Sequence, residues 1–258
     1  MSRRDTFRWN ARAIRSRLVP RRLARFWLHV QSKLRLNKSA TNRANRETFF
    51  DLAFTALQYN GIDGDYAEFG CYGGYTFAQA YEQAERRKHP AHLWGFDSFR
   101  GLPAPSGPED SHPRFRASRW ATSVDEFHQI CRVNRIPRDA YDVVEGYFED
   151  TIGKLAPGDA PTNLCLAYVD CDLYSSTRTV LEFLAPRLKH GMILAFDDYY
   201  CWSSTAAAGQ RVAVAEVLEG HERWNLLPYL QFGWHGASFI VEDRALLRGP
   251  SGLSAQSA

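Results

Sequence analysis

"LCLAYVDCDLYSST", residues 164–177, begins as an unbroken apolar run and ends in two aspartates that flank a cysteine. A second run of this kind, "MILAFDDYY" at 192–200, follows, and a helical segment at 176–189 separates the two. Continuous apolar runs are typical of parallel strands that are buried on both faces of a sheet. Strands joined by one crossover helix lie side by side in a doubly wound sheet, about 4.8 Å apart. The sequence therefore predicts that the acids ending the two runs meet at one sheet edge.

Three of these acids, Asp170, Asp197 and Asp198, are expected to face the same point. Three carboxylates at one point repel each other unless a cation joins them. Mg²⁺ prefers oxygen ligands in octahedral geometry, so we predict a Mg²⁺ site formed by these residues. Helix capping is the common role of a single aspartate at a strand end, and we expect it of Asp172.

Length and composition limit the class of protein. The 258 residues suit one large domain, or one domain with an appendage, and 45% hydrophobic with 24% charged residues is a soluble, globular composition. No apolar run approaches the roughly 18 residues that cross a bilayer, and the N-terminus lacks the apolar core of a signal peptide. Five cysteines without CxxC spacing favour a reducing, cytoplasmic location over a disulfide framework or a zinc site.

The basic charge is concentrated in the leader of the chain. Up to Arg46 there are 14 Lys and Arg against one acid, Asp5, which leaves 18 basic and 28 acidic residues, or a net charge of −10, for the remainder. The overall net charge of +3 therefore does not indicate a nucleic-acid-binding domain.

The segment at 21–36 predicts a cationic amphipathic helix. Its apolar residues recur at helical spacing: Leu23, Phe26, Trp27, Val30 and Leu34. We expect this stripe to pack on the body. A contact with a membrane surface or another anionic partner, and an Arg-rich organellar transit peptide, are the alternatives.

After a helix expected at 46–60, short apolar runs alternate with helical segments. This alternation predicts an α/β fold with a mostly parallel, doubly wound sheet covered on both faces. The last two runs, 224–233 and 237–243, predict an antiparallel hairpin at the sheet edge. We expect a basic extension at 1–45, a Rossmann-like domain at 46–248 and a disordered tail at 249–258. The Pro- and Gly-rich loop at 101–116 is long enough to suggest a function in covering a site.

The first three strand–helix turns are candidates for a cofactor site. In "AEFGCYGGYT", Glu68 ends a strand, and Gly70 and Gly73 allow backbone N–H groups to approach a ligand, although an ordinary strand end fits equally. Asp97 ends the second strand, where an acid commonly binds ribose hydroxyls, and Ser98 can cap the next turn. Gly146-Tyr147-Phe148 follows the third strand, and its aromatic rings fit either an adenine pocket or the core.

With these motifs in order, "GDYAEFGCYGGYT", "LWGFDSFRGLP", "VVEGYFEDT", "YVDCDLYSST" and "FDDYY", the chain resembles the macrocin/mycinamicin (TylF/MycF-like) O-methyltransferase family over about residues 46–243. The resemblance implies a class I Rossmann-like fold, S-adenosylmethionine and Mg²⁺ as cofactors, and methylation of a sugar hydroxyl on a natural product. The acceptor would be a small, glycosylated molecule, and a homo-oligomer is left open.

The resemblance also implies roles for particular residues. The cofactor-binding residues would be Glu68, Gly70, Tyr72, Gly73, Asp97, Ser98, Gly146, Tyr147 and Phe148. Within this set, Glu68 and Gly70 would lie at the methionine part, the second turn at the ribose or adenine, and the third turn in the adenine pocket. The Mg²⁺ ligands would be Asp170, Asp197 and Asp198, with Asp170 also the base.

The chemistry of the acids agrees with this reaction. A sugar hydroxyl is hardly ionised at neutral pH, and coordination to Mg²⁺ lowers its pKa and fixes its direction. A carboxylate within about 3 Å can then take the proton. His221 and His235 could also act as bases, although packing or surface roles are the simpler expectation.

Two other functions fit parts of the chain. Asp170-Cys171-Asp172 has the D-x-D pattern of a metal-dependent glycosyltransferase, which would leave Glu68 and the second acid pair unexplained. A binding module docked on a membrane or polyanion by its basic helix would explain only the first 46 residues. Tryptophans that either stack on a sugar or belong to the core are Trp120, Trp202, Trp224 and Trp234.

Overall fold

The computed structural model describes residues 40–156, 158–202, 204 and 209–247. The amphipathic helix predicted at 21–36 and the tail predicted at 249–258 lie outside the described residues. Within the described ranges, no helix combines the length and hydropathy that a membrane span requires.

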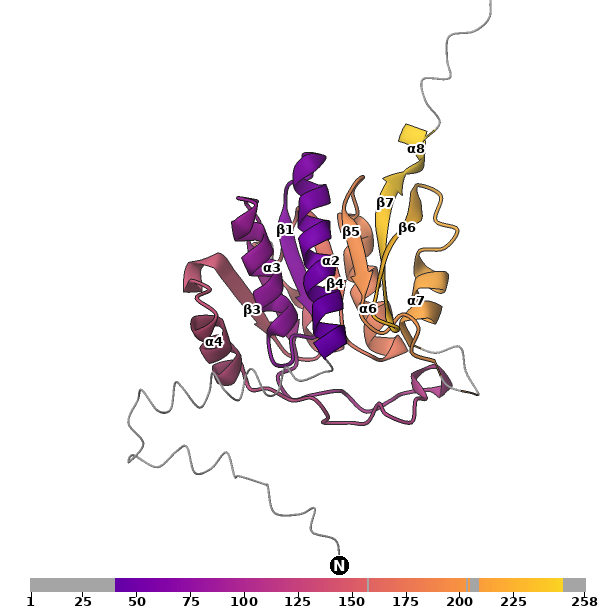
Figure 1. Cartoon of the computed structure of the whole chain (residues 1–258). Helices are drawn as coiled ribbons and strands as arrows, with labels where there is room; N and C mark the ends of the chain where they lie inside the picture. The colour runs from indigo at the N-terminus through magenta and orange to yellow at the C-terminus, as the bar shows by residue number, and fades with distance from the viewer. Residues whose placement is uncertain (1–39, 157, 203, 205–208, 248–258) are drawn as a thin grey trace, which may run out of the picture.

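A seven-stranded sheet forms the centre of the molecule, in the order β3-β2-β1-β4-β5-β7-β6 (Figure 1). The strands are β1 (Asp65–Phe69), β2 (Leu93–Asp97), β3 (Tyr141–Glu145), β4 (Leu164–Val169), β5 (Ile193–Phe196), β6 (Trp224–Phe232) and β7 (Gly236–Asp243). The pairings among β1 to β5 are parallel, and β7 is antiparallel to both β5 and β6. The doubly wound sheet and its terminal hairpin are therefore confirmed. The chain order reverses between β1 and β4, which is where ligands bind in such sheets.

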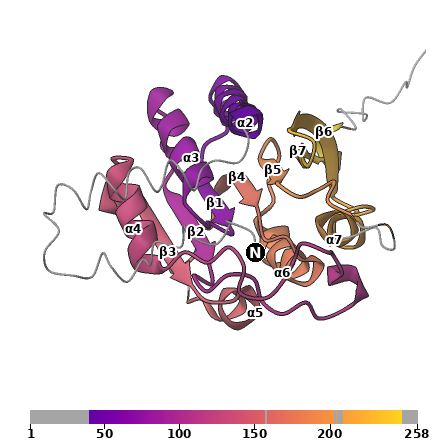
Figure 2. The same ribbon diagram turned by 60° about the horizontal axis from the view of Figure 1, so that its bottom comes forward.

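Helices cover both faces of the sheet (Figures 1 and 2). They are α2 (Ala40–Tyr59), α3 (Tyr75–Arg86), α4 (Val124–Val133), α5 (Phe148–Thr151), α6 (Tyr174–Leu184), α7 (Gly209–Val217) and the short α8 (Arg244–Leu247). One core cluster joins α2, α3 and α4 to the sheet, and a second joins α5, α6 and α7 to its other face. β4 is buried at every position because it lies between β1 and β5 with helices on both sides.

Helix α2 already includes Ala40, the first described residue, so it extends at least six residues before the predicted start at Arg46. No glycine or proline interrupts the segment from Ala40 to Tyr59, so its first turns can continue the helix. The helix thus runs through the boundary predicted between residues 45 and 46, and Arg46 lies within it.

Candidate active site

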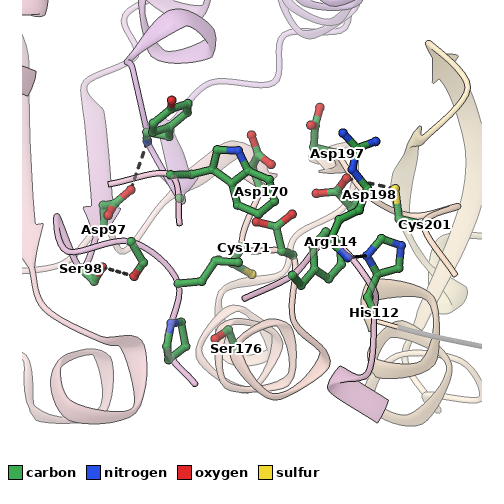
Figure 3. A pocket seen from close by; sticks show the side chains of 18 of the residues that line it. Asp97, Ser98, His112, Arg114, Asp170, Cys171, Ser176, Asp197, Asp198 and Cys201 are labelled. Carbon is green, nitrogen blue, oxygen red and sulfur yellow. Dashed lines mark hydrogen bonds between the residues drawn. The ribbon is translucent and has the colours of Figure 1, made fainter. Parts of the chain in front are cut away.

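A cavity of about 500 Å³ lies at the carboxyl ends of the parallel strands. Residues that follow β1, β2, β3, β4 and β5 line it, and so do two residues of α2, Asn42 and Arg46. The loop between β2 and α4 contributes a further wall, which includes His112, Arg114 and Phe115 (Figure 3).

Gly70 permits a close approach of two turns at the reversal of strand order. Its φ is +95°, and a Cβ on this residue would lie 2.0 Å from the carbonyl oxygen of Asp170. The backbone is held there because Asp170 N–H donates to Phe69 O at 2.8 Å. Gly70 and Tyr72 line the cavity, whereas Gly73 is not among its lining residues. Any larger residue at Gly70 would separate β1 from β4 at the edge of the site.

Asp97 ties the first turn to the end of β2. Its Oδ2 accepts the backbone N–H groups of Cys71 at 2.6 Å and Tyr72 at 3.1 Å, and its Oδ1 accepts that of Phe99 at 2.6 Å. Burial raises the pKa of Asp97, and these backbone hydrogen bonds oppose the rise. The Ser98 hydroxyl accepts the backbone N–H of Arg100 at 3.1 Å and donates to Gly101 O at 2.8 Å, so Ser98 caps its own turn and also lines the cavity.

Glu68 differs from its expected place at the methionine end of the cavity. Its side chain is fully buried, and its carboxylate accepts hydrogen bonds from the Tyr66 hydroxyl and from Thr76 Oγ1, the latter at 2.7 Å. Burial raises the pKa of Glu68 to about 8. The two-residue period of a strand places Glu68 on the same face as Tyr66, toward helix α3, and it is not among the lining residues.

The third turn contributes Gly146, Tyr147 and Phe148 to the cavity wall. Gly146 has φ +137°, and a Cβ there would lie 2.5 Å from Thr151 Cγ2. Phe148 is also a core residue, because it is buried and packs edge-on against Phe69 with ring centroids 6.1 Å apart. Phe148 therefore belongs to the core and also lines the cavity.

Asp170, Asp197 and Asp198 line the same cavity (Figure 3). Strands β4 and β5 are paired neighbours, with Val169 opposite Phe196, so their carboxyl ends lie next to each other as predicted. Among the described residues, however, the group of three side chains that could hold a metal ion is Asp197, Asp198 and His235, whose candidate ligand atoms lie within 4.8 Å of one another. His235 thus joins the acids, and Asp170 faces the cavity outside this triplet.

Asp197 is held by two side chains that the sequence analysis did not assign to the site. Arg46 Nε donates to Asp197 Oδ1 at 2.8 Å, and Arg46 Nη2 donates to Oδ2. The Tyr168 hydroxyl also donates to Oδ1, at 2.5 Å. Arg46 lies three and four residues before the buried Phe49 and Phe50, and this helical spacing was the available sign that Arg46 points inward.

His235 is buried and lines the cavity, so the surface role is excluded for this residue. It lies in the turn between β6 and β7, and its Nδ1 is 2.5 Å from the carbonyl oxygen of Asp197. His221 lies elsewhere, at the start of β6, where its Nδ1 accepts the N–H of Arg223 at 3.1 Å. Of the four tryptophans, Trp120 and Trp234 line the cavity, Trp224 is buried in the core, and Trp202 is exposed.

The expected capping role of Asp172 is wrong. Helix α6 has Leu173 at its N-cap without a side-chain capping bond, and Asp172 has a left-handed φ of 62°. The α6 N-terminus is instead capped from outside by Asp110, which accepts Ser175 N–H and Ser175 Oγ–H, both at 2.9 Å. Asp172 could not act as the cap because a helix N-cap requires an extended conformation.

The loop between β2 and α4 is therefore fastened to the core beside the site. Asp110 is buried in it, and Phe115 packs in a small apolar cluster with Leu173 and Cys201. His112 stacks near Phe115, with ring centroids 4.1 Å apart. This loop, whose length suggested a function in covering a site, forms the side of the cavity that faces the acids (Figure 3).

The strand order, the antiparallel last pair and the cavity at the strand reversal define the class I methyltransferase fold. The model of the macrocin O-methyltransferase (TylF) family matches residues 39–219, and the chain belongs to this family. A relative from Streptomyces olivaceus, 8-demethyl-8-(2,3-dimethoxy-alpha-L-rhamnosyl)-tetracenomycin-C 4'-O-methyltransferase, is 30% identical over 150 residues, which are 54% of each protein. The match thus spans about half the length of that relative.

Solved structures show the same fold. The calicheamicin methyltransferase CalS11 superposes with a TM-score of 0.66 at 21% identity, covering 89% of this chain and 88% of that one. The O-methyltransferase NovP gives a TM-score of 0.61 at 21% identity, covering 76% and 79%. These likenesses confirm the predicted fold class.

Proposed function

We propose that the protein transfers a methyl group from S-adenosylmethionine to a hydroxyl group of a sugar on a small natural product, with Mg²⁺ at the acidic end of its cavity. Family membership and the name of the Streptomyces olivaceus relative support the reaction and the kind of acceptor. The observation that carries the proposal is one cavity with Asp97 and the first turn at one end, Asp197 and Asp198 at the other, and Asp170 between them.

At the cofactor end, the first turn presents its backbone to the cavity at Gly70 and Tyr72. Asp97 holds this turn and ends β2, the position from which an acid binds ribose hydroxyls in this fold. Tyr147 and Phe148 offer an aromatic wall suited to adenine. Glu68 lies behind this site and would act indirectly, by supporting the first turn. Gly70 and Tyr72 would contact the methionine part of the cofactor.

The donor set at the other end fits a divalent cation. Asp170, Asp197 and Asp198 supply carboxylate oxygens, the ligands that Mg²⁺ prefers, and Arg46 forms an ion pair with Asp197. We infer that Asp170 and Asp198 would hold the cation together with Asp197, and His235 lies close enough to orient them. When bound, Mg²⁺ would polarise an acceptor hydroxyl, and S-adenosylmethionine would supply an activated methyl group.

The residues of this chain would orient the acceptor, exclude water and take its proton. Asp170 is the proposed base, because it faces the cavity between the cofactor turn and the acid pair (Figure 3). The fastened loop between β2 and α4 would exclude water from the acceptor, which strengthens every electrostatic interaction in the cavity. No covalent intermediate is needed, since alignment of hydroxyl and methyl carries most of the acceleration.

The test is methyl transfer by Asp170→Asn. We expect this variant to bind S-adenosylhomocysteine like the wild type, measured by thermal shift, and to lose at least about a hundredfold in kcat on a glycosylated acceptor. Wild-type turnover by Asp170→Asn would rule out its role as the base. A wild-type protein stabilised by UDP- or GDP-sugars and not by S-adenosylhomocysteine would instead favour the glycosyltransferase, which family membership does not favour.

A further inference from the structure

We propose that Arg46 is a positioning residue of the acidic site, which fixes the Asp197 carboxylate from helix α2. This inference rests on the proposed function, because Asp197 belongs to the proposed cation site. Arg46 does not act on the acceptor; it acts by determining where the oxygens of Asp197 point.

The contacts are those of a carboxylate held on both oxygens. Arg46 donates through Nε to Oδ1 and through Nη2 to Oδ2, and Tyr168 adds a second hydrogen bond to Oδ1. A planar guanidinium that binds both oxygens fixes the plane of the carboxylate as well as its position. The backbone of Asp197 is held too, through the contact between its carbonyl oxygen and His235 Nδ1.

Burial indicates that this ion pair serves the site. The side chains are 3% exposed for Arg46 and 1% exposed for Asp197, yet both line the cavity. A buried ion pair is weak evidence for stability, because desolvation offsets the attraction and packed apolar residues can replace it. A pair retained at the wall of a ligand cavity, next to Asp198, is better explained by the need for a fixed carboxylate.

Helix α2 is built to hold Arg46 in this place. Asn42 lines the cavity one helical turn before Arg46, so this face of the helix turns toward the site. Phe49 and Phe50 follow on the same side and are fully buried, and Phe50 stacks on Tyr168 with ring centroids 5.3 Å apart. The packing that anchors α2 therefore also positions both donors to Asp197.

The alternative is that Arg46 serves only as a counter-charge to Asp197, and this role predicts the opposite effect on Mg²⁺ binding. Arg46 as a counter-charge would repel a cation, so its removal would strengthen Mg²⁺ binding. Arg46 as a positioning residue is needed for an ordered ligand set, so its removal would weaken Mg²⁺ binding. Residues that orient a metal ligand typically contribute 10- to 100-fold to metal affinity.

The experiment compares Arg46→Gln and Arg46→Lys with the wild-type chain in calorimetric titrations with MgCl₂. The matched control is Arg87→Lys, because Arg87 binds Asp51 of the same helix α2 and does not line the cavity. We expect both Arg46 variants to weaken Mg²⁺ binding at least about tenfold, and the control to leave it unchanged. Binding by Arg46→Gln as tight as the wild type, or tighter, would overturn the proposal.

Two further measurements keep the proposal testable. If the Arg46 variants do not fold, Tyr168→Phe removes only one donor to Oδ1, and unchanged Mg²⁺ affinity in that variant overturns the proposal while weaker binding supports it. If the wild type binds no Mg²⁺, the proposed role of Mg²⁺ is refuted, and the positioning role of Arg46 is then tested by kcat. A kcat of Arg46→Lys reduced about tenfold, at wild-type affinity for S-adenosylhomocysteine, then supports the positioning role, and a wild-type kcat overturns it.

Discussion

At the scale of single residues, two buried acids have opposite environments. The Asp197 carboxylate is buried against a guanidinium, which balances its charge. The Glu68 carboxylate is buried against the hydroxyl groups of Tyr66 and Thr76, and these neutral groups do not balance its charge. Desolvation therefore raises the pKa of Glu68 to about 8, and the buried group is mainly protonated at neutral pH.

This shift predicts how stability depends on pH. The folded protein keeps the Glu68 proton up to about pH 8, whereas the unfolded chain loses it near the ordinary value of 4.5. The stabilisation is therefore complete below pH 4.5 and is lost as the pH rises through 8. Between these two pH values the free energy of unfolding of the wild type should fall with rising pH. We expect Glu68→Gln to reduce this slope by up to about 1.4 kcal/mol per pH unit.

The measurement is a set of urea unfolding curves at several pH values. Glu145→Gln, at the exposed end of β3, is the control and should keep the wild-type slope. A Glu68→Gln variant with the wild-type slope would contradict the assignment of a protonated Glu68.

At the scale of elements, the loop between β2 and α4 is joined to helix α6 by one side chain. Asp110 accepts the two hydrogen bonds from Ser175 and two from Ser106, whose N–H and Oγ lie 2.9 and 3.0 Å from Asp110 Oδ2. These bonds cap α6 and hold the wall of the cavity that carries His112 and Arg114. One N–H group of the first turn of α6, that of Ser175, is thus satisfied by a residue 65 positions earlier.

We expect Asp110→Asn to release this loop. An asparagine amide has one oxygen that accepts hydrogen bonds and an NH₂ group that donates them, so it cannot accept hydrogen bonds at both positions as the carboxylate does. The variant should lose about 2 kcal/mol in the free energy of unfolding and raise the acceptor KM about tenfold. Trypsin should also cleave it faster after Arg114 or Arg116. Glu109→Gln, the exposed neighbour in the same short helix, is the control, and equal proteolysis of both variants would argue against the fastening role.

At the scale of the whole molecule, charge is distributed unevenly. The residues after Arg46 have a net charge of −10, and part of this acidity is concentrated at the carboxyl ends of β4 and β5. Arg46 offsets Asp197, and Asp170 and Asp198 face the same cavity. A cluster of carboxylates in a cavity favours a bound cation over an anionic ligand at that end.

We therefore expect EDTA to abolish methyl transfer and added Mg²⁺ to restore it. The measurement is methyl incorporation into a glycosylated acceptor, with S-adenosylhomocysteine binding as the control, since Asp97 and the first turn do not need the cation. Full activity in the chelator would mean that the acids serve the fold and the proton transfer without an ion.

The sequence by itself determined the order of strands and helices, the terminal hairpin and the adjacency of the two strand ends that carry Asp170 and Asp197. These features follow from local periodicity and from the handed connections of a parallel sheet, which are readable from short segments. Only the tertiary structure decided that Arg46 holds Asp197 across 151 residues, that His235 joins the acids, and that Asp110 caps α6 in place of Asp172. Such contacts depend on how α2, the hairpin and a long loop pack on the sheet, and no local pattern encodes that packing.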